Sequence, residues 1–152
     1  MKLFCLKENP KPFKMEELVE FVSFLNAKPE HSSSFCPQNK KIIEQELSDS
    51  IQLGRVIACK ESNVLIGLCN CRFDEERRVA DCNLFIHPNK SEAYDEIAEV
   101  MLRILKQHIP DGTPLCFSIS AQNQACRNFL ESHHAEKQDG SEGQQYLLSK
   151  KF

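Results

Sequence analysis

A strand, a helix and a second strand follow one another in the second half of the chain, and this order constrains the fold more than any other feature. Val79 to His87 reads as a strand, and Leu115 to Ser120 reads as another. Between them the apolar residues recur at helical spacing until Pro110 to Gly112 ends the helix. These residues are Ile97, Val100, Met101, Ile104, Leu105 and His108. Such a crossover makes its two flanking strands parallel neighbours in one sheet.

The remaining segments predict a mostly antiparallel sheet with helices packed on it. Short apolar runs bounded by turn residues predict five more strands, and apolar spacing of three and four residues predicts three more helices. The predicted strands are residues 2–7, 55–61, 64–73, 135–138 and 144–150, and the predicted helices are residues 14–26, 123–132 and one that Pro37 opens and Gly54 ends. Ser62-Asn63 suits a hairpin, and residues 139–143 suit another. The sequence therefore predicts one α/β (α+β) domain over residues 1–152, with about seven strands and four helices.

Composition excludes several classes of protein. The 19 basic and 22 acidic side chains give a net charge of −3, and no basic field is present that would bind nucleic acid. No apolar run is long enough for a membrane span or a signal peptide. The 8 cysteines are therefore expected as free thiols in a reducing cytoplasm. Cys69 and Cys71 are the only close pair, and without a CxxC or HxxxH partner they are expected in the core, so no metal site is predicted.

Three segments of the sequence stand out in their order and spacing: "VIACKESNVLIG" from Val56 to Gly67, "ADCNLFIHP" from Ala80 to Pro88, and "SISAQNQACRNFLE" from Ser118 to Glu131. Together they resemble the GNAT superfamily of acyl-CoA-dependent N-acyltransferases. The first is similar to the second and third strands of that family, the second to its fourth strand, and the third to its fifth strand and fourth helix. The resemblance covers nearly the whole chain. It implies acetyl transfer to a small-molecule or peptide amine, with acetyl-CoA bound where strands four and five splay apart.

The resemblance also implies which residues would contact acetyl-CoA. The pantetheine arm would run along the fourth strand, and the pyrophosphate would lie at the start of the following helix, where free backbone N–H groups favour an anion. The implied contact residues are Leu84, Phe85, Ile86, Ser91, Glu92, Ala93, Tyr94, Asp95, Glu96, Ile97, Asn123 and Phe129.

The loop before the third helix departs from the family pattern. Residues 89–96 contain no glycine, although glycines let a backbone approach phosphate closely. Glu92, Asp95 and Glu96 place negative charge where a pyrophosphate would bind, opposed only by Lys90. A structural interpretation fits the same residues, with Ser91 as the N-cap and the acids stabilising the first turn. The loop therefore argues against acetyl-CoA while it supports the helix.

The catalytic residues also depart from the pattern. Leu130 stands where many family members place a tyrosine that protonates the leaving thiolate, and His133 is the nearest substitute. A histidine at a helix end is also an ordinary capping or solvated group. Asp81 matches the fourth-strand carboxylate that some members use as a general base, and a structural pair with Arg77 or Arg78 is the alternative. The turn after the fourth helix must form without glycine, because His134 and Ala135 replace the usual Gly-Phe.

Two hypotheses follow from these residues. One is an acyl-CoA-dependent N-acyltransferase that uses Asp81 and His133. The other is a GNAT-fold module that binds a small ligand or regulates a partner and no longer uses CoA. The loop between the first two helices, residues 27–38, would line the acceptor pocket and shows no charge pattern that selects one amine. Exposed strand edges can pair across a dimer, so a homodimer is compatible with the sequence.

Overall fold

The computed structural model describes residues 1–138, 144–150 and 152. The predicted hairpin turn at residues 139–143 lies outside them. The elements in chain order are β1 (Lys2–Cys5), α1 (Met15–Asn26), α2 (Lys40–Gln52), β2 (Val56–Glu61), β3 (Val64–Asp74), β4 (Val79–Ile86), the 3-10 helix η1 (Pro88–Ala93), α3 (Tyr94–Lys106), β5 (Leu115–Ile119), α4 (Gln124–Ser132), β6 (Glu136–Gln138) and β7 (Gln144–Leu148).

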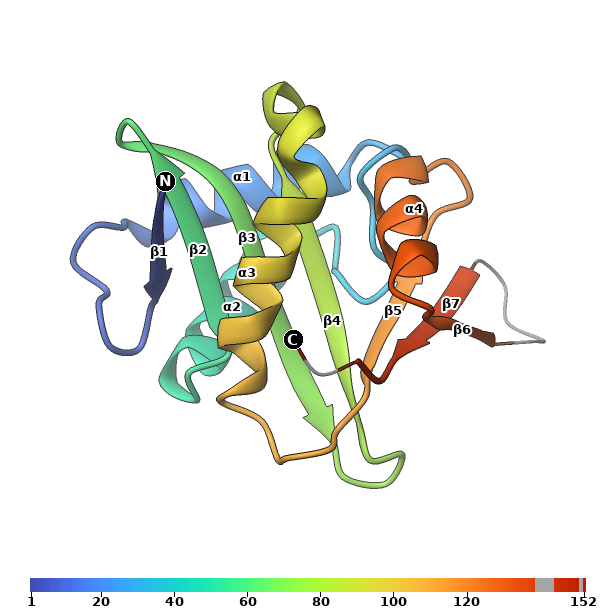
Figure 1. The fold of residues 1–152 in the computed structure, drawn as a ribbon. Helices are drawn as coiled ribbons and strands as arrows, with labels where there is room; N and C mark the ends of the chain where they lie inside the picture. Colours follow the sequence, from blue (N-terminus) through green and yellow to red (C-terminus); the bar gives the residue numbers. More distant parts are fainter. Residues whose placement is uncertain (139–143, 151) are drawn as a thin grey trace.

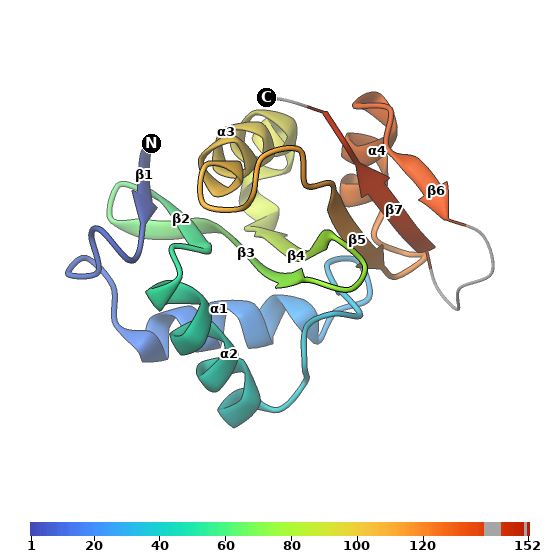
Figure 2. The same ribbon diagram turned by 90° about the horizontal axis from the view of Figure 1, so that it is seen from below.

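Seven strands form one mixed sheet in the order β1-β2-β3-β4-β5-β7-β6. β4 and β5 are parallel, and every other neighbouring pair is antiparallel. α1 and α2 cover one face of the sheet, and α3 and α4 cover the other (Figures 1 and 2). The predicted fold class and the parallel crossover are therefore confirmed.

The core has two parts, one on each face of the sheet. Alternation along the strands sends Leu68 and Phe85 toward α1 and α2, and Cys69 and Leu84 toward α3. Cys69 and Cys71 are buried in the α3 half, as the sequence predicted. Gly67 lets α3 approach the sheet, because an added Cβ would stand 3.0 Å from Met101 Cε. None of the helices in the described part of the chain is both long and apolar enough to span a membrane.

All four helix starts differ from the sequence prediction, those of α1 and α4 by one residue, at Met15 and Gln124. Pro37 does not open α2, which begins at Lys40 after Asn39 caps it by accepting from the N–H groups of Lys41 and Ile42. α3 begins at Tyr94, ahead of the first helically spaced apolar residue, Ile97, because the 3-10 helix η1 leads directly into it. Apolar spacing alone reveals neither a cap nor a short 3-10 turn.

Candidate functional site

The β4–β5 pair separates after its first three residue pairs. The parallel register runs from Ala80 with Leu115 to Cys82 with Phe117. β4 then continues to Ile86 paired with β3 but no longer with β5. We call the segment beyond Cys82 and Phe117 the splay. Ala80 N donates toward β5, to Pro114 O, whereas His87 N donates toward β3, to Ile66 O.

Backbone direction alternates along a strand, so this pattern fixes which peptide groups point into the splay. Those of Leu84 and Ile86 point away from β3 into it, whereas those of Phe85 belong to the β3 ladder. The side chains of Leu84 and Ile86 are buried under α3. The resemblance implied that Leu84, Phe85 and Ile86 contact acetyl-CoA. Of these, Leu84 and Ile86 direct their backbone N–H and C=O groups into the splay, where a ligand can reach them.

The β5 edge of the splay is occupied by the loop between α1 and α2. Ser33 forms an antiparallel bridge with Ile119, and Ser34 N donates to Ser118 O at 2.7 Å. Asn123, an implied cofactor contact, caps α4 through its Oδ1 and donates from Nδ2 to Ser32 O at 3.2 Å. This loop therefore behaves as a short extra strand against β5, and β4 keeps the open edge.

A buried polar cluster lies beneath the splay, on the face that α1 and α2 cover. Asn70 and Asn83 are cross-strand neighbours on β3 and β4, and each is 5% exposed. Ser33 Oγ donates to Asn83 Oδ1 at 2.5 Å. Ser118 faces the same side from β5, because its neighbours Phe117 and Ile119 belong to the opposite core. We call these four residues the amide recess.

Two members of the amide recess have unused hydrogen-bonding capacity. The side chains of Asn70 and Ser118 have no hydrogen-bond partner among the described residues. Within the described part of the chain, the fully buried side-chain nitrogens without a partner belong to Arg55 and Arg127, so the polar atoms of Asn70 and Ser118 lie within reach of water. The amide recess therefore offers water-accessible hydrogen-bonding groups to a ligand. It carries no local sequence signal, because its members come from three strands and one loop.

Asp81 lies two residues from Asn83 on the same face of β4. Arg77 Nη1 donates to both of its carboxylate oxygens, each at 3.0 Å, so the alternative pairing that the sequence suggested is present. The other Arg77 nitrogen lies 3.6 Å from Cys116 Sγ, and burial, aided by the Asp81 carboxylate, raises the pKa of that thiol. Asp81 also borders an open hollow of about 390 Å³. The ion pair holds Asp81 at that hollow, where water reaches it.

The start of α3 differs from the predicted anion site. The α3 N-cap is Ala93, which offers no side-chain bond, and Ser91 lies inside η1, so the prediction of Ser91 as the N-cap is wrong. His87 caps η1 instead, its Nδ1 accepting from Asn89 N at 3.1 Å. Lys90 pairs with Glu61 at 3.1 Å. The one cation of this loop is thus already paired with an acid.

The carboxylates at the α3 start are exposed and form no ion pair with a basic side chain among the described residues. These are Glu92, Asp95 and Glu96. The first helical residue, Tyr94, is only 8% exposed and fills the space between α3 and α4, where its ring meets that of Phe129 at 6.3 Å. Burial, with the nearby Cys126 thiol, raises the pKa of the Tyr94 hydroxyl well above its usual range. Ile97 is also core. The α3 start is therefore packed by Tyr94 and Ile97 on its buried side and carries exposed carboxylates on its outer side.

His133 lies at the opposite end of α4 from the splay. Ten residues separate it from Asn123, which corresponds to about 15 Å of helix. Its Nδ1 is 2.7 Å from Lys150 Nζ, and its ring packs on Phe129 and Phe152. Leu130 is fully buried. The structure therefore brings Asp81 near the splay and leaves His133 away from it.

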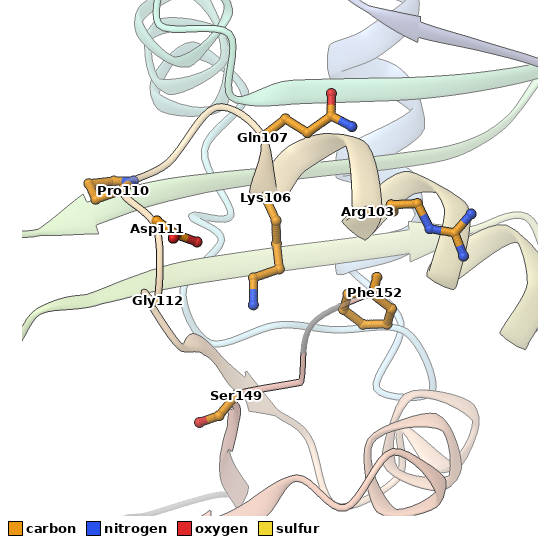
Figure 3. A pocket seen from close by; sticks show the side chains of 8 residues that line it. All are labelled: Arg103, Lys106, Gln107, Pro110, Asp111, Gly112, Ser149 and Phe152. Carbon is orange, nitrogen blue, oxygen red and sulfur yellow. The ribbon is translucent and has the colours of Figure 1, made fainter.

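A further hollow, of about 320 Å³, lies at the C-terminal end of α3 (Figure 3). Arg103 and Lys106 reach it from α3, and Phe152 closes one side. Lys106 Nζ donates to Lys150 O at 2.9 Å. None of the residues predicted from the sequence lines it, and it lies at the other end of α3 from Tyr94. We therefore do not assign it to the candidate site.

The fold is that of GNAT acetyltransferases. An N-acetyltransferase from Staphylococcus aureus Mu50 superposes with a TM-score of 0.69 at 12% identity, covering 97% of each chain. The PaiA N-acetyltransferase of Thermoplasma acidophilum, in complex with coenzyme A, gives 0.66 at 16% identity over 96% of each chain. A GNAT superfamily phosphinothricin acetyltransferase from Sinorhizobium meliloti, in complex with acetyl-CoA, gives 0.64 at 8% identity, covering 96% of this chain and 85% of the other. No protein-family model and no curated protein matches the sequence.

Proposed function

We propose that this chain is an N-acyltransferase that takes an acyl group from an acyl-CoA thioester and transfers it to a small-molecule or peptide amine. The observation that carries the proposal is the open edge of β4, with the peptide groups of Leu84 and Ile86 directed into the splay. A pantetheine arm is extended and contains amide groups, so it can pair with such an edge as an added strand does. Structural neighbours from T. acidophilum and S. meliloti contain coenzyme A or acetyl-CoA.

The amide recess supports an amine acceptor on the other side of the splay. A carboxylate in its place would favour the protonated ammonium, which has no lone pair for attack. The amide oxygens of Asn70 and Asn83 accept an N–H without carrying a full charge. The recess therefore suits a neutral amine, the form that attacks a thioester.

The roles of the chain's own groups follow from their positions. Acetyl-CoA, when bound, supplies an activated thioester. The Leu84 N–H polarises the carbonyl oxygen, as donors at an oxyanion do. Asp81 accepts the proton of the attacking amine through a water molecule as the C–N bond forms and the C–S bond breaks. Solvent protonates the departing sulfur, because Leu130 offers no proton and His133 lies far along α4.

One observation favours a second function, a module that binds a small ligand at the amide recess without CoA. The α3 start is glycine-free, acidic and filled by Tyr94. The two functions share the recess and differ in the donor. We place either function in the cytoplasm, because the 8 cysteines are free and buried.

Thermal denaturation with added ligands distinguishes the two functions. We expect acetyl-CoA at a hundred times its Kd to add about 2.7 kcal/mol of stability. Pantetheine alone should stabilise through the β4 edge, and adenosine 3′,5′-bisphosphate alone should not. Absence of any shift at millimolar acetyl-CoA would contradict the acyltransferase proposal and leave the second function.

The role of Asp81 has its own test. In an enzyme that shows the acetyl-CoA shift, Asp81→Asn should lower kcat at least about tenfold and leave the shift intact. Asp74→Asn is the matched control, because Asp74 also pairs with Arg77, at 3.4 Å. Equal losses in both variants would assign the effect to Arg77 and the turn, not to proton transfer.

A further inference from the structure

Three side chains with different metal-binding atoms converge at the edge of the molecule, away from the splay. Cys5 ends β1, Glu8 lies in the turn that follows, and His108 lies just beyond α3. One thiol sulfur, one carboxylate oxygen and one imidazole nitrogen all lie within 4.8 Å of one another. The sequence separation of more than ninety residues between Glu8 and His108 means that the fold, not local chain geometry, brings them together.

The backbone around these residues is hydrogen-bonded into place. Glu8 N and Asn9 N both donate to Cys5 O, at 3.1 and 2.9 Å, and this tight turn brings the Glu8 side chain back beside Cys5. His108 N donates to Leu105 O at 3.0 Å. Cys5 is 9% exposed, so its sulfur is fixed by the core.

Gly54 makes room for the imidazole ring. Its φ is +75°, which a glycine adopts at no steric cost. A Cβ added there would stand 2.7 Å from His108 Nδ1. Any larger residue would push the ring away from Cys5, so the placement of His108 depends on this glycine.

The potential ligand atoms are not committed elsewhere. The side chains of Glu8 and His108 form no hydrogen bond or ion pair with the described part of the chain. The Cys5 sulfur has only a long contact with Gly54 O, at 3.8 Å. A thiolate, an imidazole and a carboxylate together select a borderline-soft ion such as Zn²⁺ over Mg²⁺ or Ca²⁺, which take oxygen ligands.

We infer that Cys5, Glu8 and His108 form a zinc site with a fourth position for water. Tetrahedral zinc sets its ligand atoms roughly 3.5 Å apart, so distances of up to 4.8 Å must shorten by up to about 1.3 Å. Glu8 is exposed, so its side chain is free to rotate toward the other two ligands. Binding replaces the proton of the Cys5 thiol with the metal, and the proton passes to solvent. The ion would fasten β1 to the end of α3.

The site is independent of the proposed acyl transfer. α3 has 13 residues, so its end lies about 20 Å from Tyr94 and the loop that precedes it. A failure to bind acetyl-CoA therefore does not affect the zinc inference, and a failure to bind zinc does not affect the acyltransferase proposal.

Cobalt titration tests the inference, because Co²⁺ replaces Zn²⁺ and reports its ligands by absorption. After removal of metal with a chelator under reducing conditions, we expect one Co²⁺ per chain, with a thiolate-to-cobalt charge-transfer band that Zn²⁺ abolishes. Metal analysis of protein purified without an affinity tag should show zinc. We expect Zn²⁺ to raise the melting temperature of the wild-type chain.

Variants assign the ligands. Cys5→Ser should abolish the charge-transfer band, and Glu8→Gln and His108→Gln should each weaken Co²⁺ binding at least about tenfold. Cys36→Ser and His31→Gln are the matched controls and should change neither the charge-transfer band nor the Co²⁺ affinity. Since Glu8 is exposed, Glu8→Gln leaves the fold intact and keeps the test valid if Cys5→Ser fails to fold. No thiolate band in the wild-type chain, or unchanged affinity in Glu8→Gln and His108→Gln, would overturn the inference.

Discussion

The two ends of the candidate acyl-CoA site are built in opposite ways. The splay presents backbone groups, those of Leu84 and Ile86, along an open strand edge. The start of α3 presents side chains, with Tyr94 buried between two helices and exposed carboxylates around it. The first end offers polar backbone groups, and the second end offers negatively charged side chains.

The difference teaches which part of a shared fold survives sequence change. A strand edge offers the same N–H and C=O groups whatever its side chains are, and the fold is shared with structural neighbours at 8 to 16% identity. A phosphate site at a helix start depends on glycine and on charge, and single substitutions remove it. A backbone edge is therefore less sensitive to substitution than a phosphate site at a helix start.

Phe129→Ala should cause the largest loss of stability, because it leaves a cavity where Phe129 packs on Tyr94. Phe129 is fully buried, and truncation of such a side chain costs about 3–5 kcal/mol. Urea denaturation measures the loss. Phe24→Ala is the control, since Phe24 is 60% exposed on α1, and its cost should stay below about 1 kcal/mol. A small loss in Phe129→Ala would mean that the α3 start is loosely packed and can open for a ligand.

Removal of the acids at the α3 start should improve the poorer end of the site. The variant Glu92→Gln, Asp95→Asn, Glu96→Gln should bind acetyl-CoA at least about tenfold more tightly by calorimetry, since each like charge costs on the order of 1 kcal/mol at partly exposed range. The variant Glu16→Gln, Glu44→Gln, Asp49→Asn removes three exposed acids from α1 and α2 and is the control for net charge. Unchanged affinity in the triple variant would show that Tyr94 packing, not charge, excludes the pyrophosphate.

The dependence of the unfolding free energy on alkaline pH should show whether water reaches the contact between Tyr94 and α4. Burial raises the pKa of the Cys126 thiol from 9.0 to about 12, despite a hydrogen bond with Tyr94 that lowers it. Between these values the unfolded thiol loses its proton and the folded one keeps it. Stability should therefore fall as pH rises above about 9, by up to about 1.4 kcal/mol per pH unit from this thiol.

Urea midpoints at several pH values measure this slope. Cys126→Ala should flatten it relative to the wild-type chain. Other buried thiols add to the slope, including Cys36, whose pKa burial also raises to about 12. A slope that Cys126→Ala leaves unchanged would mean that water reaches the interface between α3 and α4.

His134→Gly should change the free energy of unfolding least, and it should raise stability where Phe129→Ala lowers it. His134 follows α4 with φ at +60°, the left-handed region that costs a non-glycine residue about 1–2 kcal/mol. Glycine there should stabilise the chain by about 1 kcal/mol in urea denaturation. Ser132→Gly, inside the last turn of α4, should destabilise it by a similar amount. Destabilisation in both variants would show that His134 makes contacts that outweigh its strain.

Hydrophobic periodicity predicted the helices and strands of the fold. It did not predict caps, or interactions between residues far apart in the sequence. Alternating and helical spacing placed the strands and helices of the parallel crossover, because burial of one face enforces those patterns. Ser91 was misassigned as a cap because Pro88 opens a 3-10 helix before α3. The absence of glycine after α4 correctly predicted an unusual turn, now seen at His134.

Candidate sites were harder to predict than elements. Asp81 became a candidate because it lies inside a recognisable strand. Asn70 and Ser118 carry no local signal, since a lone amide or hydroxyl in a strand is unremarkable until the sheet brings it beside another. Cys5 and Glu8, three residues apart, were a weak signal for metal that only the position of His108 completes. Such sites follow from topology and not from spacing.

Asn26 ties the end of α1 to the loop that occupies the β5 edge. Its Oδ1 accepts from Ser33 N at 2.9 Å, and its Nδ2 donates to Cys36 O at 3.2 Å. Ser33 in turn bridges Ile119 and bonds Asn83. One continuous segment, residues 26–34, thus joins α1, the β5 edge and the amide recess. If an acyl donor in the splay shifts this segment and so changes the affinity for an amine in the recess, the amine must change the affinity for the donor by the same factor.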